Sequence, residues 1–218
     1  MTYHGRVARP LVPDRLVALY PTTLLHRRLE NMGDVNRQLI ALIAQIAAGE
    51  ANASIGTTTE GGFQTRDDLF QRDHPALTVL KQHIFKAVQD YAAVLVRQEC
   101  SAPPSNVEFM LWGWGVVLKA GNSQGLHVHP NANISGVYYV TTPPSTLERG
   151  KDDGKISFYD PRPRANMNQL AFQITRRREM PTPGDMVLFP SWLEHSVSPF
   201  QGPGERICIA FNARLIMN

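Results

Sequence analysis

The sequence predicts an α+β chain that is mainly β, a two-sheet jelly roll with N-terminal helices packed on one sheet. Two observations predict this fold. Apolar residues recur with helical spacing in the first half, and short apolar runs rich in Val, Ile, Phe, Tyr and Trp, separated by Gly, Pro and Asn, fill the second. We expect one domain over residues 1–218, with a helical support region at 1–104 and a jelly-roll core at 105–218.

The composition is that of an ordinary globular protein. Of 218 residues, 43% are hydrophobic and 19% are charged, which excludes wholesale disorder, collagen-like sequence and a coiled coil. A formal net charge of +3 is too small an excess to favour a nucleic-acid partner, and the one dense run, Arg176 to Arg178, is typical of a solvated face. Cys100 and Cys208 cannot form a disulfide framework and are expected to be buried thiols.

No membrane or secretory segment is expected. No apolar run approaches the roughly 18 residues that span a bilayer, and the N-terminus lacks the apolar stretch of a secretory signal. We therefore expect a cytoplasmic protein.

Two amphipathic helices are predicted in the first half. The earlier spans residues 34–48, with Asp34 as N-cap and Gly49 as the stop, and the later spans 75–98 after an Asp73 cap. Their apolar stripes cover one face of an antiparallel sheet, which needs such a cover. The stripes consist of Val35, Leu39, Leu42, Ile43 and Ile46 in the first helix, and of Leu77, Leu80, Ile84, Val88, Tyr91 and Leu95 in the second.

The remaining elements are a loop and six strands. Residues 53–63 are polar and rich in Gly, which is typical of a loop. The number and spacing of the strands suit a two-sheet jelly roll. They are predicted at residues 107–119, 134–142, 155–159, 171–175, 185–190 and 206–214.

Three histidines form a candidate metal site. His127 and His129 lie two residues apart, so in an extended segment both imidazoles point to one face. A chance His-x-His pair is expected about 0.2 times in a chain with 7 His in 218 positions, so the spacing is not specific by itself. His195 adds a third donor from a distant segment, just after the predicted strand at 185–190.

The last predicted strand carries a candidate anion-binding residue. Alternation places Arg206, Cys208, Ala210 and Asn212 on one face of this strand. A guanidinium among apolar neighbours needs a carboxylate, and its planar fork suits bidentate capture of a dicarboxylate cosubstrate. The alternative is a structural ion pair with Glu205, Glu194 or an N-terminal acid.

The order of five sequence blocks resembles a known family. Over residues 107–214, and more loosely at 20–22 and 61–65, the chain is similar to the bacterial and phage group of 2-oxoglutarate/Fe(II)-dependent oxygenases. The blocks are HVHP at 127–130, SGVYYV at 135–140, GKISFYDPR at 154–162, PGDMVLFPSWLEHSV at 183–197 and RICIAFN at 206–212.

This resemblance implies a double-stranded β-helix that holds Fe(II) and 2-oxoglutarate. It implies a hydroxylase that uses O2 on an unidentified small molecule or protein side chain, with release of succinate and CO2. It assigns the metal to His127, His129 and His195, and the far carboxylate of 2-oxoglutarate to Arg206. Related prolyl hydroxylases place a Tyr where Tyr139 lies, to bind the same carboxylate, and Asn212 is expected at the other end of the cosubstrate.

One departure from the wider superfamily keeps alternatives open. That superfamily uses two His and one carboxylate, and here His129 stands at the carboxylate position. The third ligand is therefore His129 or a nearby carboxylate such as Asp160, for which a turn before Pro161 is the other explanation. The alternative functions are a cupin-like three-His metalloenzyme without a keto acid, and a non-enzymatic jelly-roll binding protein. The sequence indicates neither substrate identity nor oligomeric state.

Overall fold

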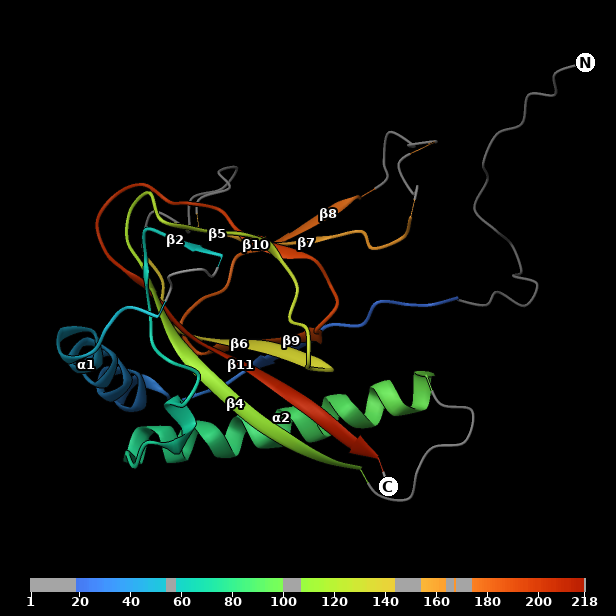
Figure 1. Cartoon of the computed structure of the whole chain (residues 1–218), viewed down its shortest axis with the longest axis horizontal. Coiled ribbons are helices and arrows are strands. Elements are labelled where there is room, and N and C mark those ends of the chain that lie inside the picture. The colour runs from blue at the N-terminus through green and yellow to red at the C-terminus, as the bar shows by residue number, and fades with distance from the viewer. Residues whose placement is uncertain are drawn as a thin grey trace, which may run out of the picture.

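The computed structural model describes residues 19–53, 58–99, 107–143, 154–163, 167 and 174–217. These residues form three layers, in which a six-stranded sheet lies between two helices and a five-stranded sheet (Figure 1). Every pairing between the named strands is antiparallel. The predicted α+β jelly roll with helices packed on one sheet is confirmed.

The strands divide between the two sheets as follows. The six-stranded sheet has the order β1 (Leu25–Arg28), β9 (Asp185–Pro190), β6 (Ile134–Thr141), β11 (Arg206–Met217), β4 (Val107–Leu118) and β3 (Phe63–Gln64). The five-stranded sheet has the order β2 (Thr59–Glu60), β5 (Ser123–His127), β10 (His195–Val197), β7 (Ile156–Tyr159) and β8 (Arg176–Glu179).

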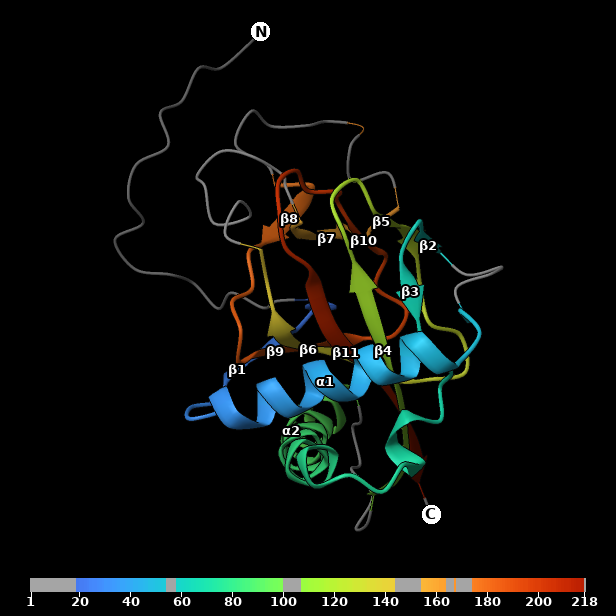
Figure 2. The ribbon, with the colours of Figure 1, turned by 90° about the vertical axis from the view of Figure 1, so that its left-hand side faces the viewer.

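Two helices cover the outer face of the six-stranded sheet. Helices α1 (Gly33–Gly49) and α2 (Pro75–Glu99) cross each other beneath this sheet, and Figure 2 shows α1 along its length and α2 end-on. A short 3-10 turn, η1 (Leu69–Gln71), precedes α2. Neither α1 nor α2 combines the length and the hydropathy needed to cross a membrane.

The predicted N-caps of both helices are wrong. Helix α1 begins at Gly33, so Asp34 lies in its first turn, where it forms an ion pair with Arg37. Helix α2 begins at Pro75, and the ring Nδ1 of His74 accepts a hydrogen bond from the Ala76 N–H at 3.2 Å. His74 rather than Asp73 therefore caps this helix, and proline occupies the first position, where a missing N–H costs nothing.

Two apolar clusters fill the spaces between the layers. The larger lies between the helices and the six-stranded sheet, and the smaller lies between the sheets. Strand β11 contributes to both, because Ile207, Ile209 and Phe211 belong to the first cluster and Cys208 to the second. The predicted alternation of β11 is confirmed, and it turns Arg206 and Cys208 toward the space between the sheets.

Several strands differ from the prediction. The N-terminal region supplies β1, β2 and β3 as well as helices, and β2 and β3 lie at the end of the predicted loop, of which residues 54–57 are outside the described part. Each of these strands is short and has no alternating apolar pattern of its own. It is a strand because it pairs with a longer neighbouring strand, which the local sequence does not indicate. Strands β5 and β10, which carry two of the histidines, were missed for the same reason.

Two further predictions, the strand at 171–175 and the two buried cysteines, fall partly outside the described residues. Of the strand predicted at 171–175, residues 171–173 lie outside the description, and 174 and 175 are irregular. The ladder is displaced to β8, where Tyr159 pairs with Arg176. Cys208 is buried as expected, and Cys100 lies outside the described residues.

Close packing at Gly136 predicts a sensitive position. A Cβ added there would lie 2.3 Å and 2.5 Å from ring atoms of Phe211, so Gly136→Ala should lower the free energy of unfolding by about 1–3 kcal/mol in urea titrations. Gly49→Ala is the matched control, because nothing lies within 4 Å of its added Cβ. Equal stability of the two variants would contradict this packing.

Candidate functional site

Three histidines meet at the open end of the space between the sheets. His127 ends β5 and His195 begins β10, and the two are direct cross-strand partners with ring centroids 4.2 Å apart. His129 follows two residues after His127, and its backbone N–H donates to the Ser191 carbonyl at 2.9 Å. One ring nitrogen from each histidine lies within 4.8 Å of the other two, so one ion can reach all three.

Backbone carbonyls orient two of the rings. The Nδ1 of His127 lies 2.7 Å from the Gly125 carbonyl, and the Nδ1 of His195 lies 2.8 Å from the Leu193 carbonyl. A carbonyl accepts only, so we assign the proton to Nδ1 and the lone pair to Nε2 in both rings. The Nε2 atoms of His129 and His195 are 3.3 Å apart. Neutral rings whose lone pairs converge in this way form a site for a cation.

Burial keeps the three imidazoles neutral. Loss of hydration lowers the pKa of His127, the pKa of His129 to about 4, and the pKa of His195 to about 3, and neighbouring imidazoles lower the last two further. Neutral imidazole is the form that binds a metal, and it suits iron, nickel, copper and zinc. Three protein ligands leave coordination positions open on such a metal.

The Asp160 side chain binds Arg162, two residues further along the chain, and so stabilises a local turn. Its carboxylate accepts from Nε of Arg162 at 3.0 Å and from Nη2 at 2.7 Å, and it also accepts from the Arg162 backbone N–H at 3.1 Å. The Arg162 side chain holds the pKa of this carboxyl below its usual range. Among the described residues, the cluster of metal-binding groups contains the three histidines and no carboxylate. The geometry therefore favours His129 over Asp160 as the third ligand.

Arg206 is a buried cation with spare hydrogen-bond donors. Its side chain is 1% exposed, Nη2 donates to the Tyr139 hydroxyl at 3.4 Å, and Nη1 contacts Sγ of Cys208 at 3.5 Å. Its Nε has no partner, and no described carboxylate pairs with it, since Glu205 instead lies 3.4 Å from Lys119. A buried charge without a counterion is costly, so this position needs an anion.

Burial also keeps the Tyr139 hydroxyl protonated. Loss of hydration raises the pKa of this fully buried phenol, so it carries its proton at neutral pH. The Arg206 guanidinium lies 5.0 Å from the centre of the Tyr139 ring. The pair thus offers N–H and O–H groups in one place.

One cavity contains both the histidines and the arginine. Its volume is about 260 Å³, and its walls include the three histidines and Arg206. Val137, Ile156 and Phe189 form an apolar part of the wall. The cavity can therefore hold a metal ion and a small anion together.

A polar edge of this cavity was not found from the sequence. Gln124 donates to Oγ1 of Thr59 at 3.2 Å, and Thr59 donates to Oε1 of Gln64 at 3.1 Å. Gln124 and Thr59 lie on the paired strands β5 and β2 of one sheet, and the Thr59–Gln64 bond joins the edge strand β2 to β3, the edge strand of the other sheet. No local pattern reveals Gln124 beside this pair, because it lies about sixty residues further along the chain.

Asn212 lies on the same face of β11 as Arg206 but outside the walls of this cavity. It is buried, and its Oδ1 accepts from the Ser135 hydroxyl at 2.7 Å. This oxygen therefore binds within the protein, and the amide nitrogen is the group of Asn212 that can donate to a ligand.

The core of the chain matches one protein family. Residues 113–212, a range that includes all three histidines and Arg206, match the family described as "Putative 2OG-Fe(II) oxygenase". The resemblance drawn from the sequence blocks is confirmed. No curated protein sequence matches the chain.

Solved structures share the fold at low identity. The prolyl-4-hydroxylase of Pseudomonas putida is 18% identical, with a TM-score of 0.56, and the match covers 88% of this chain and 92% of that one. HygX of Streptomyces hygroscopicus, with nickel and 2-oxoglutarate bound, is 14% identical, with a TM-score of 0.60 and coverage of 88% and 83%. The non-heme alpha-ketoglutarate-dependent epimerase SnoN of nogalamycin biosynthesis is 13% identical, with a TM-score of 0.59 and coverage of 88% and 76%.

The low pKa values of the imidazoles predict an acid-sensitive apo protein. An imidazole with a folded-state pKa of about 4 for His129 or about 3 for His195 gains its proton near pH 6.5 once unfolded. Its contribution to stability is therefore complete above pH 6.5 and is lost as the pH falls toward the folded-state value. In urea titrations, the free energy of unfolding should fall between pH 6.5 and 4, by up to about 1.4 kcal/mol per pH unit for each imidazole.

Two variants check this prediction. His129→Asn should flatten the pH dependence, because one of the buried imidazoles is gone. His83→Asn removes an exposed histidine of α2 and should behave as the wild type. A free energy of unfolding that is constant over this pH range would contradict the buried, neutral state.

Proposed function

We propose that this chain is a 2-oxoglutarate- and Fe(II)-dependent hydroxylase, because residues 113–212 match the family described as "Putative 2OG-Fe(II) oxygenase". One observation carries the proposal. Arg206, a buried cation without a described counterion, opens into the same cavity as the three converging imidazoles. A ligand that binds a metal at one end and presents a carboxylate at the other satisfies both groups, and 2-oxoglutarate is such a ligand.

Different residues would bind the metal and the two ends of the cosubstrate. His127, His129 and His195 would hold Fe(II), and the fork of Arg206 with the Tyr139 hydroxyl would hold the far carboxylate of 2-oxoglutarate. Asn212, on the same face as Arg206, would use its amide nitrogen toward the other end. When bound, Fe(II) and 2-oxoglutarate supply O2 activation, for the overall reaction R–H + O2 + 2-oxoglutarate → R–OH + succinate + CO2.

The protein contributes orientation and the exclusion of water. The carbonyls of Gly125 and Leu193 hold two imidazoles with Nε2 facing inward, so the site needs little rearrangement to bind a metal. Tyr139 retains its proton and can donate to a carboxylate. Val137 and Phe189 line the cavity and limit the entry of water.

A specific observation favours a second candidate. Three neutral imidazoles, without a carboxylate, are also compatible with a three-His metalloenzyme that uses no keto acid. That candidate leaves the charge of Arg206 without a counterion among the described residues, which is why we place it second.

The first test of this function uses the visible charge-transfer band between Fe(II) and a chelating keto acid. Anaerobic addition of Fe(II) and then 2-oxoglutarate should produce the band. Arg206→Ala should raise the 2-oxoglutarate concentration for half-maximal absorbance by about 100-fold, since a buried charge pair contributes about 2–5 kcal/mol. Arg27→Ala removes a guanidinium paired with Asp90 and should change nothing. Bound iron without a band would support the second candidate.

The second test separates the possible metal ligands. His127→Ala and His195→Ala should each abolish iron-dependent succinate formation and lower bound iron, measured by elemental analysis after dialysis. His129→Asp should retain iron, because it supplies the carboxylate found in the wider superfamily. Asp160→Asn should bind iron as the wild type does. Full activity of either alanine variant, or lost iron in Asp160→Asn with none lost in His129→Ala, would overturn the assignment.

A further inference from the structure

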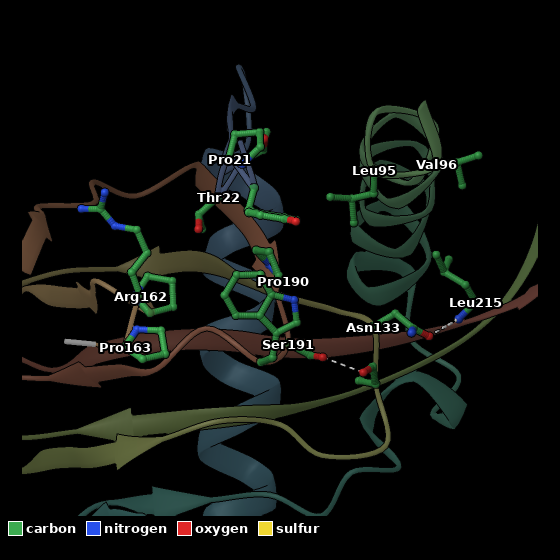
Figure 3. Close-up of a pocket in the computed structure, with 15 residues that line it drawn as sticks. Pro21, Thr22, Leu95, Val96, Asn133, Arg162, Pro163, Pro190, Ser191 and Leu215 are labelled. Carbon is green, nitrogen blue, oxygen red and sulfur yellow. Dashed lines mark hydrogen bonds between the residues drawn. The ribbon is translucent and has the colours of Figure 1, made fainter. Parts of the chain in front are cut away.

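A second, larger pocket lies beside the metal-binding end of the core. We call it the outer pocket. It has a volume of about 670 Å³ and lies between the segment at 20–23, the C-terminal part of α2 and the turn after β9 (Figure 3). A pocket of roughly 300–1,000 Å³ is of the size that takes a small organic molecule. Its walls include Pro21, Thr22, Leu95, Asn133, Pro163 and Trp192.

The walls of the outer pocket carry no uncompensated charge. Arg162 is the one ionic side chain among the described residues that line it, and the Asp160 carboxylate neutralises it through contacts at 3.0 Å and 2.7 Å. A charged ligand would lose its hydration here without gaining a counterion. The remaining walls are mostly proline, aliphatic and aromatic, so an uncharged ligand with a large apolar body fits best.

A few polar groups remain to orient such a ligand. Oδ1 of Asn133 accepts from the Leu215 N–H at 2.9 Å, and the Ser191 hydroxyl donates to the Ala132 carbonyl at 2.5 Å, as the dashed lines in Figure 3 show. No described residue accepts from Nδ2 of Asn133 or bonds to the Thr22 hydroxyl. Both groups can donate, so the ligand is expected to carry oxygen acceptors such as a carbonyl or hydroxyl group.

The outer pocket shares a wall with the candidate metal site. Phe189 and Pro190 are consecutive in β9 and point to opposite faces of the strand, so the end of β9 separates the histidine cavity, which Phe189 lines, from the outer pocket, which Pro190 lines. Beyond them, Ser191 lines the outer pocket while its carbonyl accepts from the His129 N–H at 2.9 Å. A ligand in the outer pocket therefore lies against the same turn that supports the imidazoles.

We propose that the outer pocket binds the body of the substrate, and that the substrate is an uncharged, mainly apolar small molecule with carbonyl or hydroxyl oxygens. The link to turnover rests on the proposed function, whereas the binding itself does not. The substrate would lie along the shared turn, so that a C–H bond at its end reaches the histidine cavity.

The binding is tested with N-phenyl-1-naphthylamine, a neutral apolar fluorophore, added to the metal-free full chain. We expect saturable binding to the wild type, and binding at least tenfold weaker in Leu95→Arg, which puts a charge into the pocket. Val94→Arg is the matched control, because Val94 is the neighbouring residue on α2, is 39% exposed and lies outside the pocket walls. The anionic analogue 8-anilinonaphthalene-1-sulfonate should bind the wild type at least tenfold more weakly.

A second variant guards against misfolding of Leu95→Arg. Trp192 is 53% exposed, so Trp192→Glu adds a charge at the pocket without disturbing the core, and it should weaken the neutral probe at least tenfold. Absence of binding to the wild type, or equal binding to wild type, Leu95→Arg and Trp192→Glu, would overturn the proposal.

A third measurement connects the pocket to the reaction. Neutral compounds that displace the probe are added with Fe(II), 2-oxoglutarate and O2, and succinate is measured. At least one should stimulate succinate formation, with a KM at least tenfold higher in Leu95→Arg than in Val94→Arg. Displacement without any stimulation, in a wild type that shows the charge-transfer band, would overturn the substrate role. Absence of that band would overturn the proposed function, while the probe result would stand.

Discussion

The pairing of β5 with β10 is the constraint on which the site depends. In this register His195 lies directly opposite His127, and the period of two along the chain brings His129 to the same side. The two partners come from segments more than sixty residues apart, and the pairing of β5 with β10 inside the five-stranded sheet brings them together. The backbone carbonyls of Gly125 and Leu193 then orient the rings of His127 and His195. The strand pairing therefore fixes both the positions of these two residues and the orientation of their rings.

Charge is arranged across this site in a way that favours an anionic partner. The metal-binding end consists of three neutral imidazoles, and the inner end holds the buried cation Arg206 with an unpaired Nε. Neither end has a described carboxylate to compensate it. A cavity that concentrates positive charge at both ends once a metal is bound will attract a dicarboxylate, and desolvation strengthens that attraction.

The elements outside the core shape access to the site. The helices cover the six-stranded sheet from the outside, and the Thr59–Gln64 bond joins β2 to β3 at the edges of the two sheets. On the other side, the turn after β9 supports His129 and also lines the outer pocket. The same short segment therefore serves the candidate metal site and the candidate substrate pocket.

The sequence by itself predicted the helices, the long strands and the alternating faces of β11, and it singled out three histidines and Arg206, which the structure places around one cavity. These features have a local period or a recognisable order of blocks, so they can be read from a single chain. Only the tertiary structure decided the short strands β1, β2, β3, β5 and β10, the pairing of Asp160 with Arg162 and the outer pocket. It also decided that no carboxylate among the described residues pairs with Arg206. The short strands, the outer pocket and the surroundings of Arg206 depend on contacts between distant segments, and local sequence carries no signal of which segments will meet.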